Sequence, residues 1–327
     1  MTTTALPTVQ PLLARQSVAN FAWVMGLGGL ANAYAGAHAV FGLPLWCSQV
    51  LLGLSSALFA LLVVTHVAKA LLHFDAVRAE FNHAVRSSFF PAASVATVVV
   101  AIGLRPYNEP LARALWCLGA AAHFALALTL IRRWLLAAQD KSVMTPAWFI
   151  PVVGNILLPV GGAPLGFVHA SWFFFSVGLV LWLVFFTIAM HRVLFFAPMS
   201  ERSIPTLFIL LAPPSIGFAA YTALEATQVG QVGLLATVLY NLALFIAILL
   251  ATLVPRITHG PFFLSWWAMT FPLDGWAGAC LAYHRLQPGP ATGAVAAVAL
   301  GCATLMVLWM TLRTLLYILQ GKAFLED

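Results

Sequence analysis

The chain has 327 residues, of which 62% are hydrophobic and 7% are charged, and its 15 lysines and arginines outnumber its nine acidic residues. Soluble domains carry about 25% charged residues, so this composition excludes a soluble enzyme or a water-soluble binding module. The net charge of +6 comes from basic residues between apolar runs. It therefore indicates membrane topology, with lipids as partners, and not a nucleic-acid partner.

Apolar runs recur along the whole chain, and each is close to the roughly 20 residues that a helix needs to cross a bilayer core of about 30 Å. They predict an all-α integral membrane protein with ten spans, formed as a single transmembrane domain over residues 1–327. Short tails are expected at about 1–16 and 320–327, without a removable signal peptide. The predicted spans are 18–38, 46–72, 87–104, 112–135, 146–162, 167–191, 204–225, 231–254, 263–283 and 293–319.

Ten spans assign each loop and tail to one of the two sides of the membrane, and the basic residues are distributed unequally between these sides. Twelve fall on the side of the termini: Arg15, Lys69, Arg78, Arg86, Arg132, Arg133, Lys141, Arg192, Arg202, Arg256, Arg313 and Lys322. Three fall on the other: Arg105, Arg113 and Arg285. Because cytoplasmic loops carry the excess of lysine and arginine, both termini are predicted in the cytoplasm, with the protein in the inner or plasma membrane.

The odd-numbered spans contain helix breakers, whereas the even-numbered spans are almost purely apolar. The breakers singled out are Gly28, Gly29, Pro91, Pro151, Asn155, Pro213, Pro214 and Pro272. Proline inside a helix removes a backbone hydrogen bond, and the freed groups must then face protein or water. The prolines recur about every 60 residues, the length of one helical hairpin. This pattern predicts five repeated hairpins, with an inner ring of odd helices around a central pore and an outer ring of even helices.

Alternatives remain open for these helix breakers, for Arg86 and for Asp274. Glycine and proline are common in membrane helices simply because they allow close packing, although packing does not explain the strict alternation. Arg86 is either an anion attractor at the pore mouth or only a residue of the membrane surface. Asp274 lies within the ninth span, where an ionised carboxylate costs several kcal/mol unless it is hydrated or paired, so it either faces the cavity or bridges two helices.

A conduit lined by helix ends, without buried lysine or arginine, favours weak binding and fast passage of anions. No metal, haem or other cofactor is predicted, because the histidines are scattered and only His123 lies well inside a span. The four cysteines are expected to be buried single thiols. No catalytic arrangement is apparent, so the chain is not predicted to be an enzyme.

Several motifs in matching order resemble the tellurite-resistance/dicarboxylate transporter family, which includes bacterial TehA and the slow anion channels of plant guard cells. The motifs are Val77–Phe81 (VRAEF), Val85–Phe90 (VRSSFF), Thr145–Asn155 (TPAWFIPVVGN), Leu211–Gly217 (LAPPSIG) and Ser265–Pro272 (SWWAMTFP). The resemblance covers essentially the full chain.

The resemblance implies a homotrimer in which every protomer has its own pore, and a phenylalanine of the ninth span, here Phe271, that occludes the pore as a gate. The expected function is then an anion channel or uniporter that passes small inorganic or organic anions. An alternative is a proton-coupled transporter of sulfite or C4-dicarboxylates such as malate, with Asp274 as its proton site. A membrane enzyme or redox protein is a third hypothesis, from a different class.

Overall fold

The computed structural model describes residues 11–137, 144–226, 228–258 and 262–321, with the side chain of Thr258 left out. Every regular element in these residues is helical. The longer helices are α2 (Phe21–Phe41), α3 (Leu45–Leu72), α4 (Phe74–Asn82), α5 (Pro91–Leu104), α6 (Glu109–Leu136), α7 (Phe149–Gly162), α8 (Val168–Phe195), α9 (Ala212–Leu224), α10 (Leu234–Thr258), α11 (Thr270–Leu286) and α12 (Pro290–Leu319). Shorter elements are α1 (Leu12–Arg15) and the 3₁₀ helices η1 (Val18–Asn20), η2 (Arg86–Phe89), η4 (Pro146–Trp148), η5 (Ile204–Leu211) and η6 (Leu264–Met269).

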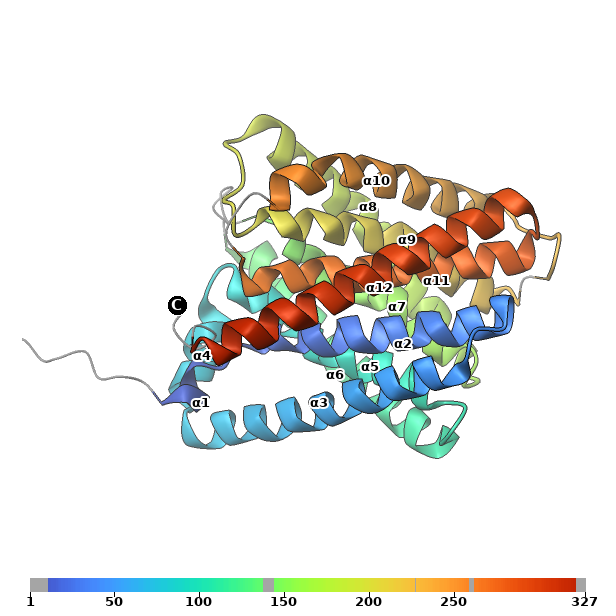
Figure 1. The fold of residues 1–327 in the computed structure, drawn as a ribbon. Coiled ribbons are helices and arrows are strands. Elements are labelled where there is room, and N and C mark those ends of the chain that lie inside the picture. The colour runs from blue at the N-terminus through green and yellow to red at the C-terminus, as the bar shows by residue number, and fades with distance from the viewer. Residues whose placement is uncertain (1–10, 138–143, 227, 259–261, 322–327) are drawn as a thin grey trace, which may run out of the picture.

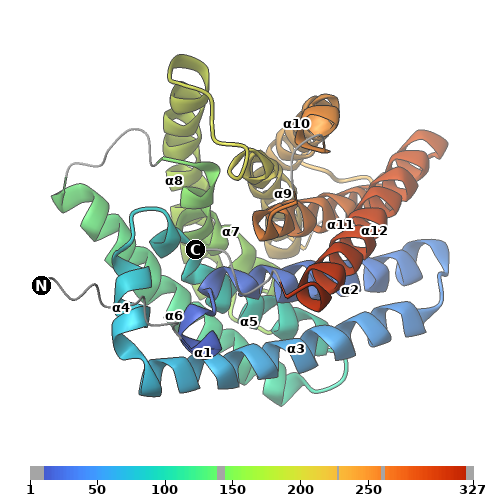
Figure 2. The same ribbon diagram turned by 60° about the vertical axis from the view of Figure 1, so that its left-hand side comes forward.

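The long helices form five successive hairpins: α2 with α3, α5 with α6, α7 with α8, α9 with α10, and α11 with α12 (Figure 1). The first helix of each hairpin contacts the first helices of its neighbours, and the contact of α11 with α2 closes this inner ring. Each second helix packs outside its own partner and against the next inner helix. Figure 2 shows the outer helices arranged around the inner ones. The predicted arrangement of an inner and an outer ring is therefore present.

The two rings differ in how much of their apolar surface is buried. Arg86–Leu104 and Ile204–Leu224 each contain an inner helix, and 67% of the most apolar stretch in each segment is buried. In the five outer helices the buried share of the corresponding stretch is only 17–33%. Outer helices thus expose rows of large apolar side chains, such as Leu54 of α3 and Phe245 of α10, as expected of surfaces in contact with lipid. The fold is that of an all-α integral membrane protein.

Seven helical segments of the described chain are long and apolar enough to cross a membrane, and Pro146–Gly162 is a shorter apolar one. The inner helices α2 and α11 fall outside this set; they carry polar residues such as Asn32 and Asp274. Because the outer ring shields inner helices from lipid, they need less apolar surface than the outer ones do. Ten membrane spans stay a prediction, although the five hairpins are present.

Three details differ from the sequence-based expectation. The five prolines singled out in the odd spans lie at helix starts and not at breaks within helices: Pro91 begins α5, and Pro151, Pro213, Pro214 and Pro272 lie within the first three residues of their α-helices. Proline is tolerated there because the first amides of a helix have no intrahelical acceptor.

The second difference is α4, a helix that the sequence interpretation did not predict. It lies beside α1 and the end of α3 and carries both charged and apolar residues. The third concerns the cysteines: Cys280 is buried, but Cys117 and Cys302 are exposed on outer helices. The expectation of buried thiols is wrong for these two, because a thiol is apolar enough to face lipid.

The two ends of the described chain lie at the same end of the bundle, where α1 precedes the first hairpin and α12 ends the last (Figure 1). The beginnings of all five inner helices lie at this end too, because each hairpin returns the chain to it. Two of the twelve basic residues assigned to this side, Lys141 and Lys322, lie outside the described residues. So do the outermost parts of both predicted tails.

Candidate functional site

A cavity of about 950 Å³ lies where the five inner helices begin. All five helices, or the 3₁₀ segments that precede them, contribute to its wall. The deepest lining residue of each inner helix is apolar: Met25 on α2, Val95 on α5, Leu157 on α7, Ile216 on α9, and the Phe271–Pro272 pair on α11. These last lining residues, one set on each inner helix and here called the apolar ring, lie in the first two turns of α2, α5, α9 and α11 and in the third turn of α7.

Helix geometry gives this cavity a favourable electrostatic environment for anions. All five inner α-helices follow a 3₁₀ segment, α5 after one intervening residue and the others directly, and their first turns line the cavity. The amino end of an α-helix carries a partial positive charge of about half an elementary charge. Several such ends converge on one space, so they favour a negatively charged occupant.

Charged side chains at the cavity also have one sign. Arg15, Arg86 and Arg202 line it together with His83, and no acidic residue is among the described lining residues. Arg86 is exposed on η2, and the guanidinium of Arg202 lies 5.5 Å from the ring centre of Phe263. These arginines come from three different parts of the chain, so the fold gathers positive charge at this mouth.

His83 supports the turn that carries Arg86. Its Nδ1 accepts hydrogen bonds from the backbone N–H groups of Val85 and Arg86, each at 3.2 Å. Partial burial, and secondarily the positive charge of Arg86, lower the pKa of His83 from its ordinary value of 6.5. A neutral imidazole is required for this arrangement, because a protonated Nδ1 has no lone pair to accept with.

Phe271, the predicted gate, lies at the wall of the cavity. Its side chain is partly buried against the core, lines the cavity and belongs to the apolar ring that ends it. Pro272, the next residue, is buried and also lines the cavity. The structure therefore brings Phe271, Pro272 and Arg86 to one cavity, while the gating role of Phe271 stays a prediction.

The two glycines of α2 that were predicted to line the pore lie at contacts between helices. A Cβ atom at Gly28 would lie 2.8 Å from Ser55 Oγ of α3 and from Val99 Cγ1 of α5. A Cβ atom at Gly29 would lie 2.7 Å from Asp274 Oδ2 of α11. Neither glycine lines this cavity. Both glycines allow neighbouring helices to approach closely, which is the role that the packing alternative gave them.

The remaining predicted pore residues are buried and do not belong to the cavity's lining. Pro91, Pro151, Pro213 and Pro214 are packed inside the inner ring. The side-chain amide of Asn155 donates to the carbonyls of Pro151 and Val152 in its own helix, at 3.2 and 2.9 Å. Their contribution to a conduit beyond the cavity stays a prediction.

Asp274 is the one predicted site residue with an unusual environment. Its side chain is 2% exposed, and neither carboxylate oxygen has a hydrogen-bond partner among the described residues. It lies at the contact between α11 and α2, one helical turn past Phe271, and outside the lining of the cavity. A buried carboxyl without a partner is costly, so it is a candidate for a functional group.

Sequence reasoning did not find the apolar residues that end the cavity. Met25, Val95, Leu157 and Ile216 are apolar residues within apolar spans, so no signal distinguishes them from packing residues. It also missed the segment Leu12–Ser17, which lines the mouth. In the described ranges, no three histidine, cysteine or acidic side chains converge as metal ligands would.

Comparison with known proteins identifies the family. Residues 15–315 match the SLAC1 family, whose description is voltage-dependent anion channel. The chain belongs to this family. The SLAC1 family is one of channels and not of enzymes, and the match extends over all five hairpins. The resemblance found in the motifs is thereby confirmed.

Individual relatives agree with this family. The S-type anion channel SLAH3 of Arabidopsis thaliana is 29% identical over 315 residues, which cover 94% of this chain and 49% of SLAH3. The guard cell S-type anion channel SLAC1 of the same plant is 28% identical over 271 residues, covering 80% of this chain and 48% of the relative. The chain thus spans about half the length of these plant relatives.

A bacterial relative has nearly the same extent as this chain. The tellurite resistance protein TehA homolog of Haemophilus influenzae is 24% identical over 304 residues, which cover 92% of this chain and 90% of the homolog. The similarity therefore extends to a protein that is little longer than the hairpin domain itself.

Proposed function

We propose that the chain forms a conduit through which small anions pass down their electrochemical gradient, with Phe271 as the gate. The observation that carries this proposal is the central cavity, which begins among arginines and ends at an apolar ring that includes Phe271. The SLAC1 family and the names of the plant relatives support the same class of function.

Each part of the cavity has a physical role in this proposal. Arg86 and its neighbouring arginines raise the anion concentration at the mouth, and the amino ends of the inner helices stabilise an anion inside. The fixed positive charge lies at the mouth, so an anion is attracted without being held tightly deeper inside. Weak binding allows fast passage, which a channel requires.

In this proposal the apolar ring closes the conduit. An ion that enters a narrow apolar constriction loses its hydration shell and receives no polar ligand in return, so the constriction is a barrier. Phe271 is the largest side chain of this ring. A change of its χ1 rotamer moves the ring plane without rearranging the backbone, and such a change is sufficient to widen the passage.

The orientation follows from the distribution of charge. Ten of the twelve basic residues assigned to the terminal side are described, and they lie toward the end where the inner helices begin. Positively charged loops favour the cytoplasm, so the cavity opens to the cytoplasm of an inner or plasma membrane protein with ten spans and both termini inside. We further propose that three copies form a homotrimer, each protomer with its own conduit.

The experiment is flux of chloride in proteoliposomes that contain the full chain. Phe271→Ala should increase the rate by at least about tenfold, because removal of the ring opens the constriction. Phe245→Ala is the matched control: it removes the same atoms from a lipid-facing position of α10 and should leave the rate unchanged. An unchanged rate in Phe271→Ala, with the protein folded, contradicts the gate.

A second candidate function is coupled transport of sulfite or a C4-dicarboxylate with protons. The buried Asp274 carboxyl, which has no partner, favours it, because intramembrane carboxyls often serve in proton relays. In that case Asp274→Asn abolishes pH-dependent accumulation while leaving downhill flux intact. Equal accumulation in Asp274→Asn and in the parent protein would eliminate this candidate.

A further inference from the structure

The segment Leu12–Ser17, which comprises α1 and the two residues after it, forms part of the wall of the cavity. Leu12, Leu13, Arg15, Gln16 and Ser17 all line the cavity. The segment precedes the first hairpin, so it is not one of the helices that form the ring. Its position at the mouth therefore depends on side-chain contacts with the hairpins.

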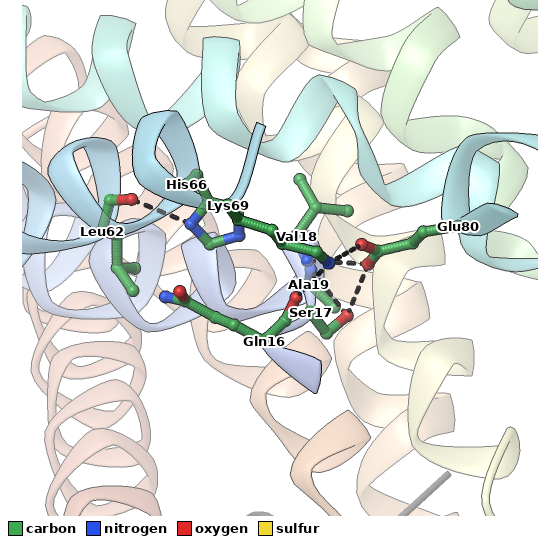
Figure 3. A network of polar contacts seen from close by, with 8 residues as sticks. All are labelled: Gln16, Ser17, Val18, Ala19, Leu62, His66, Lys69 and Glu80. Atoms are coloured by element: carbon green, nitrogen blue, oxygen red, sulfur yellow. Dashed lines mark hydrogen bonds and ion pairs between the residues drawn. The ribbon is translucent and has the colours of Figure 1, made fainter. Parts of the chain in front are cut away.

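Those contacts form one polar network with α3 and α4 (Figure 3). Lys69 of α3 donates from Nζ to the backbone carbonyl of Gln16 at 2.6 Å and to Glu80 Oε2 of α4 at 2.7 Å. Glu80 Oε1 accepts from the backbone N–H of Val18 at 2.9 Å and from Ser17 Oγ at 3.0 Å. Both members of the ion pair thus hold the same short stretch of backbone.

A further bond fixes the segment to α3. Gln16 Nε2 donates to Thr65 Oγ1 at 2.8 Å, one turn before Lys69. Thr65 lines the cavity beside Leu61 and Leu62, so the segment is attached along the wall of the cavity.

The Lys69–Glu80 ion pair is far less exposed than Arg113–Glu109, the other ion pair among the described residues. The side chains of Lys69 and Glu80 are 3% and 7% exposed, whereas those of Arg113 and Glu109 are 47% and 56% exposed. A buried pair depends on both partners, because removal of one leaves a charge without compensation. The exposed pair contributes little and can be lost without consequence.

We propose that the Lys69–Glu80 pair acts as a clamp that holds Leu12–Ser17 across the mouth and thereby limits the size of the anions admitted. Glu80 and Lys69 are positioning residues in this proposal, since they act through the segment and do not meet the anion. The proposal rests on the proposed function and adds a size limit at the mouth to the gate at Phe271. The two restrictions are separate, because the clamp and Phe271 belong to different helices.

The test compares a large organic anion, malate, with chloride in proteoliposomes that contain the full chain. Glu80→Gln, and the double variant Lys69→Met/Glu80→Gln, which leaves no lone buried charge, should raise the ratio of malate to chloride flux several-fold. Glu109→Gln, which removes the exposed pair, should leave the ratio unchanged. An unchanged ratio in both clamp variants, or an equal loss of both fluxes, overturns the proposal.

A labelling experiment separates this proposal from the proposed function. Leu13→Cys, in a chain whose four native cysteines are replaced by alanine, reports how exposed the segment is to a water-soluble thiol reagent. Release of the clamp by Glu80→Gln should raise the labelling rate several-fold, whether or not the protein passes anions. Equal rates contradict the clamp, whereas absence of anion flux from both wild type and Phe271→Ala contradicts the proposed function alone.

Discussion

Single residues in this protein have roles that their type alone does not reveal. Phe271 is one of 24 phenylalanines, and only the family resemblance singled it out before the structure located it at the end of the cavity. Gly28 and Gly29 lie in α2, which is rich in glycine. The sequence alone does not distinguish a glycine that lines a conduit from one that allows a neighbouring helix to pack closely. Contacts made by distant helices distinguish the two roles.

The contact of Gly29 with Asp274 leads to a prediction about stability. Gly29→Ala should destabilise the folded protein by about 1–3 kcal/mol, because its Cβ would meet Oδ2 and Cβ of Asp274 at 2.7 and 3.0 Å in a closely packed contact. Thermal unfolding of the purified protein in detergent measures this change.

Gly53→Ala is the control, since a Cβ atom there meets nothing within 4 Å and alanine favours a helix. If both substitutions have the same small effect, α2 and α11 do not pack as closely as described.

At the level of elements, hydrophobic periodicity and length predicted most of the helices. The predicted spans 46–72 and 146–162 agree closely with Leu45–Leu72 and Pro146–Gly162. The 3₁₀ segments before the inner helices were not predicted, because the same prolines are consistent with a break or with a helix start. Helix α4 was missed because it is short and not strongly apolar, and with it the Lys69–Glu80 pair was missed too.

The turn before η2 gives a pH-dependent prediction. The pKa of His83 is lowered in the folded protein, so the neutral imidazole contributes stability that is complete above its unfolded pKa of about 6.5. This contribution is lost as the pH falls through the lower pKa of the folded state. His83→Ala should therefore reduce the loss of thermal stability on acidification.

The control for this experiment is His169→Ala, at the opposite end of the bundle, which should keep the pH dependence of the parent protein. Thermal unfolding between pH 5 and 8 measures both variants, a range that includes the unperturbed histidine pKa. A pH profile of His83→Ala that coincides with that of the parent protein would mean that the bonds from Val85 and Arg86 do not depend on a neutral His83.

The whole molecule is a repeat of five hairpins, and its inner ring closes through the contact between its first and last inner helices. Alternation of broken and smooth spans predicted this arrangement, because only shielded helices tolerate polar residues and prolines in a membrane. The position and depth of the cavity were not predictable, since they depend on how side chains from all five hairpins meet.

Oligomeric state is tested at this scale. The purified protein should have about three times the 35.1 kDa mass of one chain in native mass spectrometry. In the proposed trimer each protomer has its own conduit, so flux from trimers mixed from wild-type and Phe271→Ala chains should rise linearly with the mutant fraction. A monomeric mass, or a strongly curved dependence, contradicts independent conduits in a trimer.

The central claim is that anions pass through this protein passively. The most direct test is the flux of chloride, nitrate, sulfite and malate into proteoliposomes of the wild-type protein under an imposed membrane potential, with and without a proton gradient. The account predicts uptake that follows the potential, reverses when its sign is reversed and does not require the proton gradient. Uptake that occurs only with a proton gradient would contradict a channel.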